Sequence, residues 1–271
     1  MSEFTYRDLT TLEEFAQVVE LERQIWGPGY DEVVPVPILA VSVHRGGILI
    51  AAFDGDRMIG FVYSLPAIKH GKATQWSHMA GVVAEHRSAG LGQKLKHLQR
   101  DRTLAMGLDL IEWTYDPLQA MNAHLNFAKL GVVVEEYAVN IYGVSASPLH
   151  GGNPTDRFVA DWWIRKPHVE ARLRGAAPLA SVLTVEPAGR AEPAGEWLAP
   201  GAIDLSLDAS RISVEIPMGF TEMLSRAPDL AVAWRMATRE IFTNYFSRGY
   251  RAVEFFIDRR ARKGAYLLAR A

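Results

Sequence analysis

The chain has 271 residues, of which 49% are hydrophobic and 22% charged, proportions typical of a globular protein that buries a core. Its formal net charge of -2 argues against a broad basic face for nucleic acid. No apolar run approaches the ~18 residues of a membrane span. The absence of cysteine excludes disulfides, thiolate nucleophiles and cysteine metal sites, and the histidines show no metal-ligand spacing. With no signal-like N-terminal pattern, we expect a metal-free cytoplasmic protein that binds neither nucleic acid nor a membrane.

The first predicted elements are a helix and a β-hairpin. Thr10 and Glu13 have the spacing of a capping box, which predicts a helix from this point through Trp26. The proline-containing segment 35–37 is expected to be extended or looped. Two apolar runs around an Asp-Gly turn at residues 54–55 then predict an antiparallel hairpin.

Two strand-to-helix connections follow along the chain. A strand is predicted over residues 75–83 and an amphipathic helix over 90–106, which Gly107 would terminate. The apolar run 108–115 predicts another strand. Asp116 and the proline after it are typical of a helix start, and the following helix would end at Gly131.

The C-terminal part contains a second copy of one motif order. Strands are predicted over 132–143 and 156–164, and residues 175–201 are then rich in Ala, Pro and Gly. A strand over 211–217, a helix over 229–248 and a closing hairpin follow. Strand, helix and strand pair thus occur twice, which favours a partial structural repeat, although this unit is common in unrelated folds.

The bend between the strand and helix at residues 82–96 has the chemistry of an anion site. The first N–H groups of a helix lack intrahelical partners, and glycines allow close backbone approach to a phosphate. The spacing of Gly90 and Gly92 fits neither the dinucleotide fingerprint nor the P-loop. The segment from Arg87 to Gly92 does fit [Q/R]-x-x-G-x-[G/A], with a basic helix after it.

That pattern in this order of elements resembles the GNAT superfamily of acyl-CoA-dependent N-acyltransferases. The resemblance covers residues 4–164. The stretch SHMAGVVAEHRSAGLG and the downstream TDRF resemble more narrowly a bacterial group of predicted acetyltransferases with an extra C-terminal region. The resemblance implies a fold that mixes helices and strands (α/β, of the α+β class). Its central sheet would be mixed but mostly antiparallel, with helices on its flanks. We expect an acyltransferase domain at residues 1–168 and a smaller α+β subdomain at 169–271.

The resemblance also assigns residues to acetyl-CoA, the implied co-substrate. Backbone groups of Val82 and Val83 would pair with the pantetheine arm, and an amide there would polarise the thioester carbonyl. Asn122 matches a family preference for Asn near that arm, with the register offset by two. The CoA pyrophosphate would be held by backbone amides of Arg87, Ser88, Ala89, Gly90, Leu91, Gly92 and Gln93. Independently of the resemblance, Gly81 inside a strand indicates a bulge or a close backbone approach.

The catalytic residues are less well specified than the CoA loop. The superfamily's usual acid, a Tyr four residues before the helix-ending glycine, is replaced by Phe127. Tyr115, Tyr137 and Tyr142 are alternatives, and Tyr142 is retained here as the candidate acid.

Two further side chains are candidates for proton transfer. His78 lies where members often place a base, and its ordinary pKa of about 6.5 suits that role. Glu112 would either lie on an exposed face, which we favour, or face the cleft. Asp116 is expected to be a helix cap rather than a catalyst.

The acceptor would be the amine of a small molecule or a peptide, bound near Trp26, Tyr30 and Asp31. A non-catalytic acyl-CoA sensor is the alternative function, which the missing Tyr favours slightly. The C-terminal region would shape the acceptor cleft, or it would serve as an oligomerisation element, so a homodimer stays open.

Overall fold

The structure is a computed structural model that describes residues 4–27, 30, 32–143, 153–176 and 185–270. Two compact units are present. The first comprises Met1–Trp113 with Trp163–Arg165, and the second comprises Thr114–Trp162 with Lys166–Ala271. The chain passes from one unit to the other inside a strand, so this division does not coincide with the expected boundary after residue 168. That boundary remains a prediction about the acyltransferase domain.

The sheet of the first unit has the strand order β1-β2-β3-β4-β5. Neighbouring strands pair antiparallel, except that β4 and β5 are parallel. The predicted hairpin is confirmed as β2 and β3. The strands are β1 (Thr5–Asp8), β2 (Ile48–Asp54), β3 (Arg57–Lys69), β4 (Lys72–Val82) and β5 (Leu110–Tyr115).

Three helices flank this sheet: α1 (Leu12–Trp26), α2 (Val36–His44) and α3 (Leu91–Ala105). The capping box of α1 lies one residue later than expected, because Thr11 is the cap and the Glu14 side chain returns to its backbone. The expected loop at residues 35–37 is wrong. Pro35 precedes α2, and a proline at the first helical positions costs the helix nothing because its N–H is not needed there.

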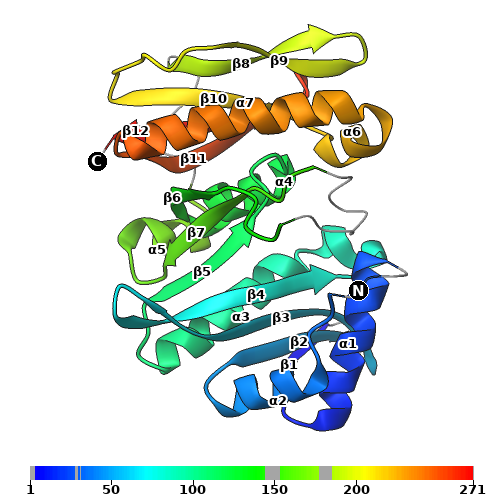
Figure 1. Ribbon diagram of the computed structural model, residues 1–271. Coiled ribbons are helices and arrows are strands. Elements are labelled where there is room, and N and C mark those ends of the chain that lie inside the picture. Colours follow the sequence, from blue (N-terminus) through cyan, green and yellow to red (C-terminus); the bar gives the residue numbers. More distant parts are fainter. Residues whose placement is uncertain (1–3, 28–29, 31, 144–152, 177–184, 271) are drawn as a thin grey trace. The chain divides into compact units, whose positions relative to one another are not determined.

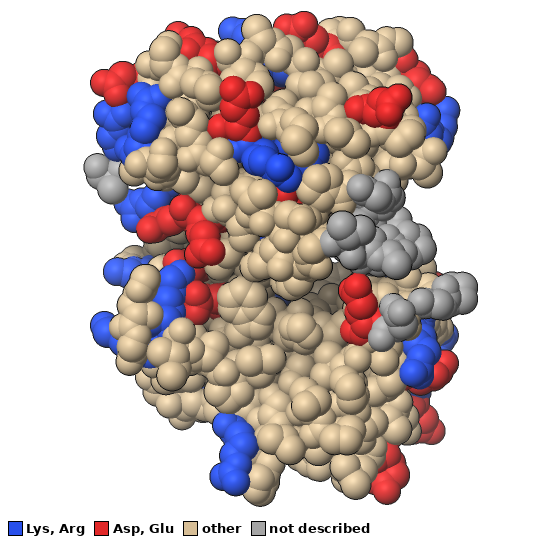
Figure 2. Space-filling model, in the orientation of Figure 1, with Lys and Arg blue, Asp and Glu red and all other residues tan. Residues whose placement is uncertain are grey.

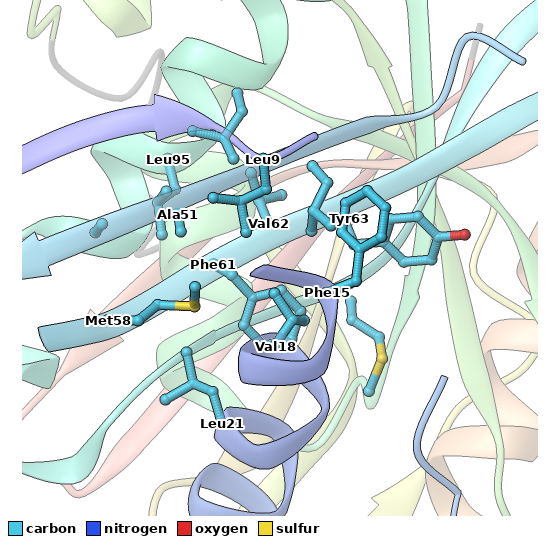
Figure 3. Close-up of a cluster of buried hydrophobic side chains, with 14 of the residues drawn as sticks. Leu9, Phe15, Val18, Leu21, Ala51, Met58, Phe61, Val62, Tyr63 and Leu95 are labelled. Carbon is cyan, nitrogen blue, oxygen red and sulfur yellow. The ribbon is translucent and has the colours of Figure 1, made fainter. Parts of the chain in front are cut away.

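The core of the first unit is formed by side chains of the sheet and of helices α1 and α3. Figure 3 shows side chains of α1 packed on side chains of the central strands. The residues that it labels are at most 9% exposed, so each buries nearly its whole apolar surface. They are Leu9, Phe15, Val18, Leu21, Ala51, Met58, Phe61, Val62, Tyr63 and Leu95.

The sheet of the second unit has the strand order β7-β6-β11-β12-β10-β8-β9. Its pairs are antiparallel except for the parallel pair β8 and β10. The strands are β6 (Val133–Ala138), β7 (Arg157–Trp163), β8 (Glu186–Ala194), β9 (Trp197–Ile203), β10 (Arg211–Pro217), β11 (Tyr250–Asp258) and β12 (Lys263–Arg270).

The longest helix of the second unit, α7 (Pro228–Ser247), packs on β6, β9 and β11 (Figure 1). The helix expected after Asp116 is confirmed but begins later, as α4 (Ala120–His124). It continues as the π-helix η2 (Leu125–Leu130), and Gly131 ends it in the left-handed conformation. Two short helices were not expected, α5 (Pro167–Leu173) and α6 (Phe220–Arg226). The hairpin of β8 and β9 was also missed, because its composition of Ala, Pro and Gly is typical of loops.

The expected repeat is present, and all of its elements except most of β5 belong to the second unit. Strand β10, helix α7 and strands β11 and β12 follow the chain order of β5, α4 with η2, β6 and β7, and both sets have the spatial order first, third, second strand. Both hairpins carry a bulge at the same place, after Val134 in β6 and after Ala252 in β11. These two residues pair with each other across the antiparallel β6–β11 ladder. The two copies are therefore related by a local twofold axis at this pair.

Buried ion pairs connect the two copies inside the second unit. The guanidinium of Arg235 on α7 binds both carboxylate oxygens of Asp116, at 2.9 and 2.7 Å. Asp116 also accepts the Leu118 N–H at 2.9 Å. The expectation that Asp116 is a helix cap is wrong, because the N-cap position of α4 is Gln119 and Asp116 is instead an ion-pair partner. Arg239 binds Asp156 in the same bidentate way, at 2.8 Å for each oxygen. The C-terminal copy therefore neutralises carboxylates of the first copy.

Charges of both signs are interspersed on the surface shown in Figure 2, without an extended area of one sign. That distribution agrees with the net charge of -2. Among the described residues, no helix is both long enough and apolar enough to cross a bilayer.

Candidate functional site

Strand β4 carries a bulge at His78. The register with β3 pairs Tyr63 with Met79 and Ser64 with Ser77, so His78 is the extra residue on β4. A bulge redirects the side chain at that position, and bulges are frequent beside active sites. The sequence had identified His78 but gave no indication of the bulge.

The imidazole of His78 is exposed and lies edge-on to the Tyr63 ring, with 6.0 Å between ring centroids. It makes no hydrogen bond or ion pair with any residue that the structure describes. Desolvation by the surrounding protein lowers the pKa of His78 below its ordinary value of 6.5. The ring is therefore neutral at pH 7 and able to accept a proton.

Strands β4 and β5 pair over a short distance and leave the end of β4 open on that side. Their ladder consists of Gln75 with Ile111 and Trp76 with Glu112. Residues of β4 beyond this point pair with β3 alone in the first unit. Because successive residues of a strand direct their N–H groups to opposite sides, an extended ligand can pair with β4 along the open side.

Val82 and Val83 differ in what they can offer such a ligand. The N–H of Val83 donates to the Ile59 carbonyl on β3 at 3.0 Å, and its carbonyl accepts the His86 N–H at 3.0 Å. By the alternation of the strand, the N–H of Val82 points away from β3. Of the two residues expected to contact the pantetheine arm, Val82 is thus the one with an N–H directed to the open side.

The predicted anion loop forms a 3-10 helix, η1 (Ala84–Ala89), followed by α3. Gly90 has φ 75°, a left-handed conformation that favours glycine, and no side chain caps α3. The first intrahelical bond is donated by Lys94 to the Gly90 carbonyl at 3.1 Å. The amides of Leu91, Gly92 and Gln93 thus lie in the first turn of a 15-residue helix, where partial positive charge accumulates.

Leu91 and Arg87 hold this turn in place. Leu91 is 1% exposed and anchors the helix start in the core. Space around Gly92 is open, since a Cβ there would meet no atom within 4 Å. Arg87 is exposed, but its Nε donates to the Val82 carbonyl at 3.2 Å and an Nη to the Ile25 carbonyl at 3.5 Å. Arg87 thus connects the loop to β4 and α1 and keeps its charge near the helix start.

The end of α1 lies directly against β4. A Cβ on Gly81 would come within 2.9 Å of Ile25 and 3.2 Å of Trp26, so the close approach expected at Gly81 is that of helix α1. The indole of Trp26 stacks on Tyr30 with ring centroids 5.5 Å apart. Of the three expected acceptor residues, Trp26 and Tyr30 therefore lie together beside β4, and Asp31 lies outside the described residues.

Glu112 is 5% exposed, so the favoured expectation of an exposed carboxylate is wrong. Its Oε2 accepts the Thr74 hydroxyl at 2.9 Å, and its Oε1 lies 3.1 Å from the ammonium of Lys69. Both oxygens are thus held by neighbours on the β3–β4 hairpin. This arrangement satisfies a buried charge, and it leaves Glu112 poorly placed to accept a proton from a substrate.

A buried lysine network behind β4 was not expected from the sequence. The ammonium of Lys96 on α3 donates to the Ser77 hydroxyl at 2.8 Å and to Gln99 Oε1 at 3.1 Å. It also lies 3.8 Å from the centroid of the Trp113 ring. Desolvation lowers the pKa of Lys96 to about 7. Its position between Leu95 and the buried Gln99 on the helical face could have indicated burial, although lysine rarely occupies such sites.

A second buried titratable group lies on α1. Glu22 is fully buried, and its Oε2 accepts the Val34 N–H at 2.9 Å. Its Oε1, the Tyr63 hydroxyl and the Ser42 hydroxyl are buried without hydrogen bonds of good geometry among the described residues. Desolvation raises the pKa of Glu22 to about 7.

The remaining predicted residues belong to the second unit. Phe127 is 1% exposed and packs edge-on to Tyr266, so the usual position of the acid is a core position in this chain. Tyr115 is buried, and the Tyr137 hydroxyl donates to Asp156 at 2.8 Å. Tyr142 is 51% exposed and shares a hydrogen bond of 2.7 Å with the Thr114 hydroxyl.

The candidate tyrosines and Asn122 differ in their exposure to solvent. Of the three candidate tyrosines, Tyr142 alone is exposed, which makes it the one accessible to a substrate. Asn122 is also exposed, on the short helix α4. In the C-terminal copy, Tyr245 occupies the position equivalent to Phe127. Tyr245 is fully buried and its hydroxyl donates to the Asp204 carbonyl at 2.6 Å, so its role is in core packing.

No protein-family model matches the sequence, and no curated protein is similar to it. Solved structures of acetyltransferases are similar in fold. A GNAT-family acetyltransferase of Streptococcus pneumoniae matches 59% of this chain and 98% of its own, at 14% identity and a TM-score of 0.47. An N-acetyltransferase of Thermoplasma acidophilum, solved with coenzyme A, matches 59% of this chain and 98% of its own, at 14% identity and a TM-score of 0.43.

The NatC complex bound to a Gag peptide and CoA matches 59% of this chain and 97% of its own, at 16% identity and a TM-score of 0.47. The expected order of helix, hairpin, strand, glycine-rich bend, helix, strand and helix is present in this chain. Likenesses at these identities and TM-scores do not determine the reaction of this chain.

Proposed function

We propose that the chain is an acyltransferase that moves an acetyl or other short acyl group from acyl-CoA to an amine. The observation that carries this proposal is the combination on β4 and α3. A bulged strand with an open side leads directly into a glycine-rich helix start whose first amides have no side-chain cap. An extended pantetheine arm and a pyrophosphate need those two features next to each other.

The proposed binding mode uses the open side of β4. The pantetheine arm pairs with the strand as an additional strand, and the N–H of Val82 is directed to this side. The pyrophosphate lies on the first turn of α3, where the amides of Leu91, Gly92 and Gln93 donate. Arg87 adds positive charge beside it. A metal has no role in this proposal.

Acyl transfer at this site needs a base for the attacking amine. The amine nitrogen attacks the thioester carbonyl carbon, its proton passes to the neutral imidazole of His78, and the carbon–sulfur bond breaks. The CoA thiolate leaves and is then protonated by solvent. Backbone N–H groups of the open strand stabilise the oxyanion that develops on the carbonyl. Trp26 and Tyr30 lie beside β4 and contact the acceptor.

A non-catalytic acyl-CoA sensor is the second candidate. The observation that favours it is the burial of Phe127 at the usual acid position, together with the engaged hydroxyls of Tyr115 and Tyr137. A CoA thiolate is a fair leaving group, so a missing acid lowers the rate without abolishing the reaction. Turnover separates the two functions.

The test is a thermal melt of the full chain with acetyl-CoA and with free pantetheine. Ligand at 100 times its dissociation constant adds about 2.7 kcal/mol of stability. In a chain of this size, that shifts the melting temperature by roughly 5–10 °C. Pantetheine lacks the pyrophosphate and should give no shift. No shift with millimolar acetyl-CoA would overturn the binding site and the reaction together.

Turnover is then measured as release of CoA thiol with a panel of small amines and peptide N-termini. The chain contains no cysteine, so a thiol reagent reports free CoA without a protein background. Release that depends on one amine supports the transferase. Tight acetyl-CoA binding with no release across the panel would instead support the sensor.

A further inference from the structure

The second unit contains a surface pocket of about 210 Å³ that the proposed reaction does not use. Its walls come from three connections. The β8–β9 turn contributes Pro193, Glu196 and Trp197, the end of β10 is followed by Met218, and the β11–β12 turn contributes Arg260 and Arg262. The Met218 N–H donates to the Arg262 carbonyl at 2.9 Å, which fixes two of these connections against each other.

The repeat explains why a pocket forms at this place. Strand β8 runs parallel to β10 for three pairs, the last being Val214 with Gly189, and then turns to pair with β9. In the first unit β4 and β5 are likewise parallel and end their ladder early. Parallel strands that separate at their carboxyl ends leave a crevice, which is where ligands of such sheets bind. The pocket lies beyond the carboxyl ends of β8 and β10.

The pocket walls carry two guanidinium groups, Arg260 and Arg262, and one carboxylate, Glu196. One Nη of Arg226 donates to both carboxylate oxygens of Glu196, at 2.9 and 3.0 Å, and its other Nη donates to Glu222 at 2.5 Å. The Arg226 guanidinium lies 5.3 Å from the centroid of the Trp197 ring. Arg262 donates to the backbone carbonyl of Glu196 at 3.2 Å, which leaves its charge unpaired. Arg260 is exposed and has no hydrogen bond or ion pair with any described residue. Neither Arg260 nor Arg262 has a carboxylate partner among the described residues, and together they exceed by one the charge of Glu196, the carboxylate in the pocket walls.

The backbone at Arg262 is in an unfavourable conformation. Its φ is 53°, in the left-handed region that non-glycine residues rarely adopt. The neighbouring turn residues of the β8–β9 hairpin use glycine for the same purpose, with Gly195 at φ 64°. A turn selected only for folding would favour glycine at position 262 as well. Strain retained at a charged residue is found more often at binding sites than in ordinary turns.

We propose that this pocket binds a small organic anion that combines a phosphate or carboxylate group with a planar ring. The anionic group is bound by Arg260 and Arg262, and the ring packs on the Trp197 indole and the Met218 side chain. Guanidinium groups bind such anions with paired N–H donors, and an aromatic face favours a planar partner.

The pocket is not a second CoA site. It is small for a nucleotide-containing ligand, since pockets for drug-sized molecules occupy about 300–1,000 Å³. The helix that follows β10, α6, has seven residues and lacks a glycine-rich loop comparable with 87–92. The proposed ligand is therefore distinct from the acyl donor.

Isothermal titration calorimetry of the full chain with phenyl phosphate tests this proposal. We expect binding at low millimolar concentration or tighter. Inorganic phosphate and the neutral benzyl alcohol should each bind at least about tenfold more weakly, because each retains one of the two recognised groups. Binding of either at the same affinity as phenyl phosphate would overturn the stated ligand class.

Three variants locate the site. Arg260→Gln and Arg262→Gly should each weaken phenyl phosphate binding at least about tenfold, whereas Arg259→Gln, one residue away and outside the pocket walls, should not. Arg262→Gly also relieves the left-handed strain, so its melting temperature should equal or exceed that of the parent chain. Unchanged binding in both pocket variants, or absence of phenyl phosphate binding to the parent chain, would overturn the proposal.

Discussion

The ammonium nitrogen of Lys96 lies 3.8 Å from the centroid of the Trp113 indole, and among the described residues it has no carboxylate partner. Burial of this group lowers its pKa to about 7, from an ordinary value of 10.5. Between these two pH values the unfolded chain binds more protons than the folded one. The free energy of unfolding therefore rises as pH increases from 7 toward 10.

Lys96→Met should remove this part of the pH dependence. From pH 7.0 to 8.5 the parent chain should gain about 1–2 kcal/mol more stability than the variant, because one pKa unit corresponds to 1.36 kcal/mol. Urea unfolding at the two pH values measures the difference. Lys94→Met, an exposed position on the same helix, is the control. Parallel behaviour of parent and Lys96→Met would show that the lysine is charged in the fold at both pH values.

Glu22 should shift stability in the opposite sense. Burial raises its pKa to about 7, so its contribution is fully present below the unfolded value near 4.5 and is lost as pH rises through 7. Glu22→Gln keeps an acceptor for the Val34 N–H without a titrating group. The variant should be about 2 kcal/mol more stable than the parent at pH 8 and close to it at pH 5. A variant that is less stable at pH 8 would contradict this account.

Gly92 offers the cleanest test of the anion loop. Its backbone needs no positive φ, and the space beyond it is open, so a side chain there should not disturb the fold. Gly92→Glu places a carboxylate at a helix start, which the helix tolerates but a pyrophosphate does not. Acetyl-CoA affinity by calorimetry should fall at least about tenfold.

Gly92→Gln is the matched control, since it has nearly the same shape without the charge. It should retain most of the affinity. Equal loss in both variants would indicate a steric effect, and no loss in either would place the pyrophosphate elsewhere. Gly90 is unsuitable for this test because its φ of 75° makes any substitution strained.

His78 should determine the acidic limb of the pH–rate profile. Because desolvation lowers the pKa of His78 below 6.5, kcat/KM should be constant near pH 7 and should fall at a pH below 6.5. His78→Gln should reduce kcat by about 10²–10⁴ and remove that limb. His44→Gln, an exposed histidine on α2, is the control. A full rate with an unchanged limb in His78→Gln would exclude His78 as the base.

The ion pair of Arg235 and Asp116 should matter for stability far more than surface pairs do. Arg235 is 2% exposed, and Arg235→Met leaves a largely buried carboxylate without its partner. The expected loss is about 3–5 kcal/mol. Arg251→Met breaks a comparable pair with Glu135 at the surface and should cost less than about 1 kcal/mol. Equal effects in urea unfolding would contradict the burial argument.

Much of the fold could be read from local patterns. The hairpin of β2 and β3, the strand before the anion loop, helix α3 and the C-terminal strand–helix–hairpin all follow from apolar periodicity and turn glycines. Elements whose composition is atypical were missed. Helix α2 begins behind a proline and is apolar on most sides, and the β8–β9 hairpin is rich in Ala, Pro and Gly.

The candidate catalytic side chains show the same limit. His78 could be selected because imidazole is suited to proton transfer and lies on the correct strand. The sequence could not reveal the bulge that redirects it, since a bulge depends on register with β3. Glu112 was expected at the surface, but the neighbouring hairpin supplies Lys69 and Thr74 as partners.

The sequence by itself determined the glycine-rich connection at residues 82–96, because glycine positions, helix start and preceding strand are local properties of a dozen residues. It also determined the repeat of strand, helix and strand pair. Only the tertiary structure decided which polar groups are buried and how they are satisfied: Lys96, Glu22 and the Arg235–Asp116 pair. Burial of a polar group, and the hydrogen bonds or ion pairs that satisfy it, involve residues distant in the chain. No local sequence pattern encodes the free energy of these long-range contacts.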